Sequence, residues 1–211
     1  MRVTVFGATG GVGVQVVRQA LDAGHDVTAV VRDPARLDAG PHDRLEVLTA
    51  DVMDPAAIEP AVAGRDAVFC SLGPRGSGPT TVVTDGVRSI VTAMRAAGTR
   101  RLLVVTASGF HTEGDGVLVR GVLKPLVGRM LRHQFADMAR AERVVEDSGL
   151  DWTIVCPPRL RDKPYTGRVR SRVGANVRGG FSIRRPDVAA YLLRAAADTS
   201  LVGKPVFIAA A

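Results

Sequence analysis

Short apolar segments alternate with amphipathic ones along most of the chain. The amphipathic segments have helical period and most are followed by a glycine; they span residues 12–23, 80–97 and 134–148, and another begins at 187. The apolar segments are rich in β-branched residues and predict buried strands at 3–6, 26–31, 44–49, 67–70, 101–105, 152–156 and 205–208. Asp33-Pro34 and Asp54-Pro55 predict two further helix starts, because each sets an N-cap carboxylate before a proline.

This alternation of strands and helices predicts an α/β fold with a doubly wound, Rossmann-like parallel sheet, covered by helices on both faces. The sequence contains no repeat, low-complexity tract or linker, so we expect a single domain over residues 1–211 with a small C-terminal cap after Cys156. Ligands of such sheets lie at the carboxyl ends of the strands. The loops after the first, second, fourth, fifth and sixth strands should therefore line one crevice.

The composition is that of a globular protein, with 46% hydrophobic and 23% charged residues. Apolar runs break after four or five residues, far short of the roughly 20 that cross a bilayer. The N-terminal segment reaches a glycine at position 7 before any leader-like apolar run develops. We therefore expect a cytoplasmic protein with no membrane partner.

The net charge of +7 lies in the C-terminal half, since residues 1–100 carry 10 basic and 11 acidic side chains. Aromatic residues make up only 4%, which leaves few platforms for base stacking, so we favour a small anion over nucleic acid as the partner.

Cys70 and Cys156 stand in apolar segments typical of packed thiols. No cysteine and histidine cluster has metal-ligand spacing, so we expect no metal.

The segment GATGGVG joins the first strand to the first helix and sets Gly7, Gly10 and Gly13 at dinucleotide-binding spacing. Gly7 would permit the sharp turn, Gly10 the approach of a pyrophosphate, and Gly13 the close packing of helix on sheet. Thr9 can add a hydroxyl donor. The alternative is a glycine turn that only connects two elements, but the strand and helix on either side favour a nucleotide site.

Arg32 follows the second strand, where an NAD-preferring site usually carries an acidic residue. A guanidinium there matches a 2′-phosphate, and Arg36 lies one helical turn further on, so the sequence favours NADPH as the cofactor. Asp33 precedes Pro34 and should turn its carboxylate toward the short helix. The alternative for Arg32 is an ordinary solvated loop residue.

The motifs GATGGVG, VTAVVRDPARL, AVFCSLGPRGSGPTTVVTDGVRSIVTAMRAAG, LLVVTASGF and SGLDWTIVCPPRL cover most of the chain. With them the chain resembles the atypical short-chain dehydrogenase/reductase group of NAD(P)H-binding, NmrA-like proteins, most nearly the biliverdin-IXβ reductase/flavin reductase type. The resemblance implies cofactor contacts from Gly7, Thr9, Gly10, Gly11, Val12, Arg32, Arg36, Asp51, Val52, Leu72 and Gly73. For Leu72, plain core packing is the alternative.

Many short-chain reductases carry a Tyr-x-x-x-Lys pair on the helix after the fifth strand, and here HQFADMARAERVVEDSG contains neither residue. The absence disfavours alcohol and ketone chemistry and agrees with the type named above, whose conjugated acceptors can take a hydride first. The resemblance suggests Ser108 as the catalytic and substrate-binding residue, with Phe110 beside it. Arg159 would bind acidic groups of the substrate. A hydroxyl that only holds its own loop and a surface charge are the respective alternatives.

Residues 116–132 form an insertion with Val119, Leu123, Val127 and Met130 near one helical face and Arg120 among the residues elsewhere. It predicts a lid or a subunit contact in a monomer or homodimer, or a membrane-surface helix, and we favour the first two. Residues 168–173 alternate as an edge strand.

The leading hypothesis is an NADPH-dependent reductase of a flavin, biliverdin-like or quinone ring. The alternatives are an NADP(H)-sensing regulator of the NmrA-like kind and an epimerase relative.

Overall fold

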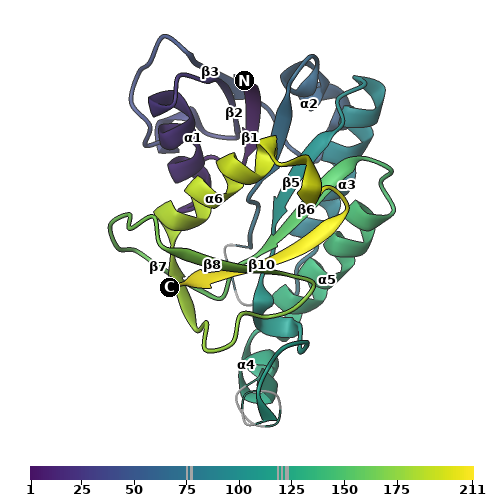
Figure 1. Cartoon of the computed structure of the whole chain (residues 1–211). Coiled ribbons are helices and arrows are strands. Elements are labelled where there is room, and N and C mark those ends of the chain that lie inside the picture. The colour runs from purple at the N-terminus through teal and green to yellow at the C-terminus, as the bar shows by residue number, and fades with distance from the viewer. Residues whose placement is uncertain (75, 77, 118, 120, 122–123) are drawn as a thin grey trace.

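The computed structural model describes residues 1–74, 76, 78–117, 119, 121 and 124–211, and a central sheet dominates it (Figure 1). Eight strands of the described chain form this sheet, in the spatial order β3 (Leu45–Thr49), β2 (Asp26–Val31), β1 (Arg2–Phe6), β4 (Ala67–Cys70), β5 (Arg101–Val105), β6 (Asp151–Cys156), β10 (Lys204–Ala210) and β8 (Val169–Val173). All neighbouring strands pair in parallel except β8, which runs antiparallel to β10. The strand order reverses between β1 and β4, and this defines the switch point of the sheet.

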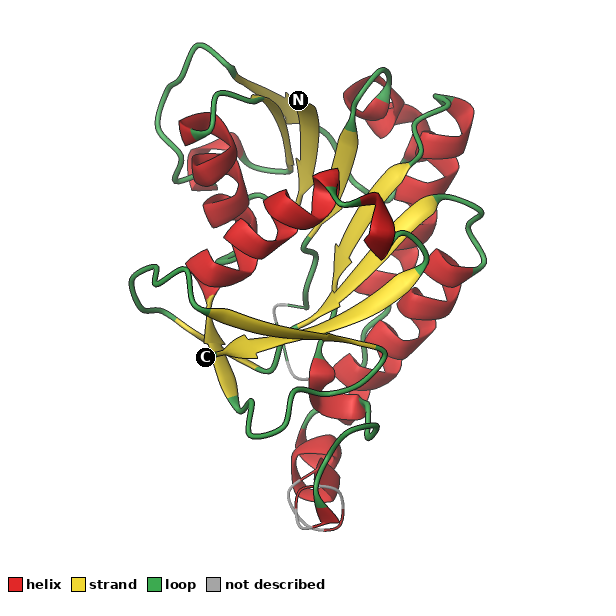
Figure 2. Cartoon of the chain, in the orientation of Figure 1, coloured by secondary structure: helices red, strands yellow, loops and turns green. Residues whose placement is uncertain are grey.

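Helices cover both faces of the sheet, as Figure 2 shows. One face carries α1 (Gly13–Asp22) and α6 (Arg185–Ala197), whose apolar sides share a core with Val3, Val5 and Val27. The other face carries α2 (Pro55–Val62), α3 (Val82–Ala96) and α5 (Arg132–Glu146), packed over Phe6 and Val68. These strands are rich in β-branched and aromatic residues. They are almost continuously apolar because both of their faces are buried.

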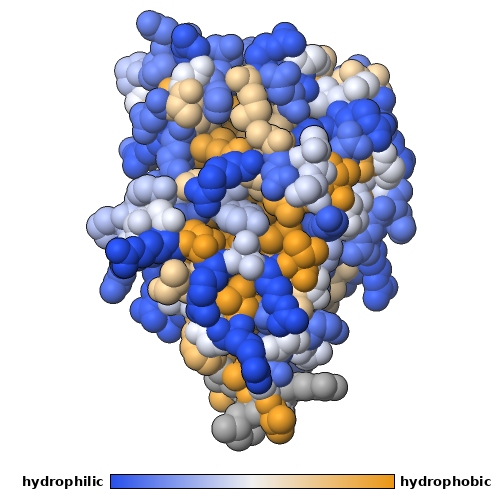
Figure 3. All heavy atoms as spheres, viewed as in Figure 1, coloured by the Kyte–Doolittle hydropathy of each residue, from blue (hydrophilic) through white to orange (hydrophobic). Residues whose placement is uncertain are grey.

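The remaining elements form the C-terminal cap and a projection. β7 (Arg159–Arg161) and β9 (Ser182–Arg184) make a separate parallel pair. Short 3-10 turns follow β2 (Pro34–Arg36), β5 (Ser108–Phe110) and α6 (Thr199–Leu201), and α4 (Lys124–Met130) projects at the lower end of the view in Figure 1. Exposed apolar side chains gather on this projection (Figure 3). The Leu126 residue is 69% exposed and Met130 is 77% exposed.

The predicted α/β fold with its doubly wound sheet is confirmed, and the predicted edge strand is β8. Both aspartate–proline starts are N-caps: Asp54 accepts from the amides of Ala56 and Ala57, whereas the turn after Asp33 ends at Arg36. Part of the insertion forms α4, and Leu123 and Arg120 lie outside the described residues. Within the described part of the chain, no helix is both long and apolar enough to span a bilayer.

Candidate functional site

A cavity of about 590 Å³ lies at the carboxyl ends of the parallel strands. Its walls come from the loops after β1, β2, β3, β4 and β5. They include every residue that the sequence assigns to the cofactor: Gly7, Thr9, Gly10, Gly11, Val12, Arg32, Arg36, Asp51, Val52, Leu72 and Gly73. Segments far apart in the sequence thus meet at one crevice, as the strand order requires. The contact of these residues with a cofactor stays a prediction.

The glycine loop is shaped by close backbone contacts. Gly7 has a φ of +76°, which L side chains rarely adopt, and a Cβ there would lie 2.6 Å from the Ser71 carbonyl oxygen. A Cβ on Gly13 would lie 2.1 Å from the Gly7 carbonyl oxygen. The turn at Gly7 and the tight helix packing at Gly13 are therefore steric requirements of this loop.

The first turn of α1 is open toward the cavity. Val12 at its N-cap makes no side-chain hydrogen bond to the helix, and no acidic residue lies in the first turn. Backbone N–H groups and the positive end of the helix dipole at such an end attract an anion. Gly10, Gly11 and Val12 lead into this turn and line the cavity; because the Gly10 amide donates to the Gly7 carbonyl, a pyrophosphate would meet the backbone donors that follow Gly10.

Two guanidinium groups border the cavity after β2. Arg32 and Arg36 both contribute to its wall. Asp33 also lines it, but its Oδ1 accepts a hydrogen bond from the Ala35 amide at 3.1 Å, as the sequence predicted. One oxygen of this carboxylate is thus engaged in the helix cap, and two guanidinium groups border the cavity at the same corner.

The loops after β3 and β4 form another part of the cavity wall. Asp51 Oδ1 accepts from the Met53 amide at 3.1 Å and holds its own loop. Leu72 lines the cavity and also packs on Gly86 of α3, where a Cβ would meet Leu72 Cδ1 at 2.5 Å. The absence of a side chain at Gly86 therefore makes room for this wall.

Arg185, at the start of α6, is a cavity residue that the sequence did not identify. Its Cδ and Nε would lie 2.6 Å from a Cβ on Gly11, so the side chain rests on the glycine loop. Asp162 holds its guanidinium at 2.5 Å, and Gln19 Nε2 donates to the Pro186 carbonyl at 2.9 Å. No local motif marks Arg185, since only the packing of α6 on α1 brings it there.

The opposite end of the cavity is formed by Val105, Thr106 and Met138. β2 and β5 are three strand spacings apart, so this end lies about 14 Å from the Arg32 corner. Met138 of α5 lines this end, and its side chain carries no proton donor. Burial raises the pKa of the nearby strand thiol Cys70 to about 12, so that group is an inert packed side chain, as its apolar context predicted.

Ser108, Phe110 and Arg159 are not in the described lining of this cavity. The Ser108 amide donates to the Pro157 carbonyl at 2.9 Å, and Phe110 stacks on His111 and Phe135. Arg159 is an exposed residue of β7. The loop after β5 forms a 3-10 turn that places Phe110 against Phe135 of α5, whereas Arg159 belongs to a different element, β7. Their contact with substrate stays a prediction.

Comparison with known proteins agrees with this geometry. The family model described as NAD(P)H-binding matches residues 7–199, and the chain belongs to that family. A Bacillus subtilis protein named "Uncharacterized sugar epimerase YhfK" is 30% identical over 195 residues, covering 90% of this chain and 85% of that protein. The Saccharomyces cerevisiae UPF0659 protein YMR090W is 28% identical over 203 residues, covering 92% and 86%.

Solved structures share the fold. The Lactococcus lactis oxidoreductase ylbE superposes with a TM-score of 0.81 at 18% identity, covering 100% of this chain and 91% of that one. A Veillonella parvula short-chain dehydrogenase/reductase in complex with NADP superposes with a TM-score of 0.77 at 20% identity, covering 99% and 94%. The open end of α1, the glycine cradle and the cations at the cavity fit the NAD(P)H that this family binds.

Proposed function

We propose that the protein is an NADPH-dependent reductase that transfers a hydride to a conjugated ring acceptor such as a flavin, a biliverdin-like tetrapyrrole or a quinone. The observation that carries this proposal is that two chemically different groups of residues lie at opposite ends of one cavity. Arg32 and Arg36 border one end, and Thr106 and Met138 border the other about 14 Å away.

The basic end supports NADPH over NADH. A 2′-phosphate carries charge that the ribose hydroxyl of NADH lacks, and a planar guanidinium binds it through paired hydrogen bonds. Asp33 turns its Oδ1 to the Ala35 amide, so this oxygen is engaged in the helix cap. The chain's own residues thus bind and orient the cofactor, which supplies the hydride when bound.

The other end supports a conjugated acceptor. α5 has the sequence RHQFADMARAERVVE, which contains no tyrosine or lysine, and Met138 is its residue in the cavity wall. A carbonyl substrate needs a proton donor as the hydride arrives, whereas a conjugated ring spreads the incoming charge and takes its proton later. This favours a ring acceptor over an alcohol or ketone pair.

The Bacillus relative's name supports a second candidate, sugar epimerisation. That reaction needs a tyrosine-like acid/base group beside the sugar carbon, and the composition of α5 disfavours it. An NADP(H)-sensing regulator is the third reading, and turnover separates it from a reductase.

The test is to mix the purified protein with NADPH and, separately, FMN, riboflavin, biliverdin and menadione, and to follow the loss of reduced nicotinamide absorbance. Acceptor-dependent oxidation supports the reductase. Tight NADPH binding with no oxidation by any acceptor contradicts it and favours the regulator. Interconversion of nucleotide sugars without net oxidation of cofactor would favour the epimerase.

A further inference from the structure

A buried cluster of polar side chains lies directly behind the Thr106 end of the cavity. Thr106 Oγ1 donates to Glu142 Oε1 at 2.6 Å, and His111 Nε2 lies 3.1 Å from Glu142 Oε2. Thr106 lines the cavity and Glu142 is 9% exposed, whereas the His111 side chain is 21% exposed. These three groups therefore connect the cavity wall to the protein surface without a break.

We propose that Thr106, Glu142 and His111 form a proton path from solvent to the acceptor. The inference rests on the proposed reductase and adds to it the group that protonates the product. A buried carboxylate without partners would be costly, and here both of its oxygens are engaged by groups that can exchange protons.

The proton balance follows the chain of contacts. The hydride brings two electrons to the acceptor, which is reduced while the nicotinamide is oxidised, and a ring heteroatom of the acceptor then carries negative charge. After the hydride has been transferred, that atom takes the proton of the Thr106 hydroxyl. Thr106 regains a proton from the Glu142 carboxyl group, Glu142 from the His111 imidazolium, and His111 from water.

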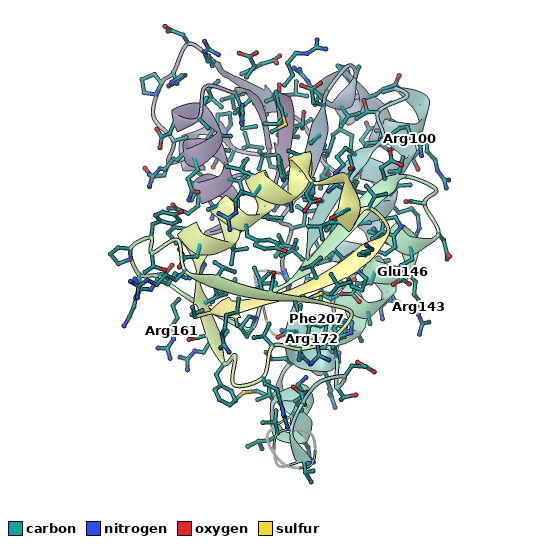
Figure 4. All side chains as sticks on the ribbon, in the orientation of Figure 1. Arg100, Arg143, Glu146, Arg161, Arg172 and Phe207 are labelled. Atoms are coloured by element: carbon teal, nitrogen blue, oxygen red, sulfur yellow. The ribbon has the colours of Figure 1, made fainter. Side chains whose placement is uncertain are left out.

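The cluster is held rigidly, as a proton path requires. The His111 ring packs edge-on against Phe207 of β10 with centroids 4.9 Å apart, and Phe207 is labelled in Figure 4. The His111 carbonyl accepts from Lys124 Nζ and from Asn176 Nδ2, which fixes the loop after β5. Neither ring nor backbone can move far without breaking these contacts.

Other titratable and charged groups surround the path. Burial raises the pKa of Cys156, and the nearby Glu142 raises it further, so this thiol stays protonated beside Thr106 and takes no part. The remaining neighbours are Glu113 and Asp115 of the loop after β5, Lys124 of α4, Arg172 of β8, and Arg143 and Glu146 of α5. Lys124 pairs with Asp115, and Glu146, Arg143 and Arg172 are labelled in Figure 4.

The test compares turnover of Thr106→Val, Glu142→Gln and His111→Asn with the acceptor found above. Thr106→Val and Glu142→Gln should lower kcat about 100-fold, the lower range for a lost general acid. The NADPH Kd should stay within about twofold, because none of the three binds the phosphates. Thr106→Ser keeps a hydroxyl and should recover most of the rate. Glu146→Gln, one helical turn along α5, is the matched control and should leave kcat unchanged.

Two readouts distinguish a proton path from a structural role. The wild-type kcat should fall as pH rises, because the path then loses its proton source. This pH dependence of kcat should be weaker in His111→Asn, which changes only the less buried end of the path. Infrared spectra during a single turnover should show a transient carboxyl band that disappears in Glu142→Gln and persists in Glu146→Gln. Wild-type rates and pH profiles in folded Thr106→Val or His111→Asn overturn the proposal. Failure of every acceptor, with NADPH bound, removes the proposed function itself and this path with it.

Discussion

Arg185 lies across Gly11, with its Cδ and Nε 2.6 Å from the position a Cβ would take. The contact links the start of α6 to the glycine loop, because Arg185 begins α6 and is held by Asp162. A guanidinium over an open helix end adds a cation where backbone donors already point. The start of α6 is thus part of the cavity wall.

Gly11→Ala should displace Arg185 and weaken NADPH binding about tenfold, because one charge-assisted contact to phosphate is lost, a loss of roughly 1.5 kcal/mol. The free energy of unfolding should change by less than about 1 kcal/mol, since a flexible side chain can move aside. Calorimetry should also show that Gly11→Ala costs little in an Arg185→Ala background. Additive losses would contradict the coupling.

Arg32→Ala should raise the Kd of NADPH by about 10- to 100-fold, as expected for loss of a charge-assisted phosphate contact. The Kd of NADH should change less than about threefold, because NADH has no 2′-phosphate. Isothermal calorimetry with both nucleotides measures this directly. Arg88→Ala, which removes an exposed guanidinium on α3, is the control. Equal losses for the two nucleotides would show that Arg32 does not select the phosphate.

Gly13→Ala should destabilise the fold severely, by about 3 kcal/mol, the upper range for inserting a methyl group into packed structure. The new Cβ would stand 2.1 Å from the Gly7 carbonyl oxygen, and neither backbone segment can yield without moving β1 or α1. Urea denaturation measures the loss. Gly128→Ala in α4 meets no atom within 4 Å and should be neutral or slightly stabilising. Similar stabilities for the two variants would refute the steric argument.

Asp137→Ala should lower the free energy of unfolding by about 3 kcal/mol. The fully buried Asp137 of α5 accepts from the Val83 and Thr84 amides at 3.0 and 3.1 Å, and so caps α3 from a neighbouring helix. Its removal leaves buried donors unpaired, each at a cost of about 1–3 kcal/mol. Asp137→Asn should cost less because one acceptor oxygen remains. Asp85→Ala, an exposed change on α3, should shift stability by less than about 0.5 kcal/mol.

Urea denaturation curves of Asp137→Ala and Asp85→Ala distinguish loss of the cap on α3 from a general effect of removing a carboxylate. If Asp137→Ala and Asp85→Ala unfold at the same urea concentration, the cross-helix contact contributes nothing measurable. Thr81 gives α3 no side-chain cap, and Thr80 Oγ1 accepts from the Val82 amide rather than from the Val83 and Thr84 amides that Asp137 holds.

The sequence by itself determined the order of strands and helices, because that order depends on local periodicity, glycine stops and aspartate–proline caps. It also determined the glycine loop and the basic residue after β2, since both are local to one β-α-β unit. Seven of the eleven predicted cofactor residues belong to this unit and the turn after it, the other four follow β3 and β4, and all eleven line one cavity.

Only the tertiary structure decided which distant residues share the site. Arg185 reaches Gly11 through the packing of α6 on α1, and Glu142 meets Thr106 across 36 positions of sequence. Ser108 and Phe110 lie in a turn that packs against α5, a conformation with no signature in the local pattern. Periodicity records which side of an element is buried, but the contacts between elements depend on how side chains from separate segments fit together in space.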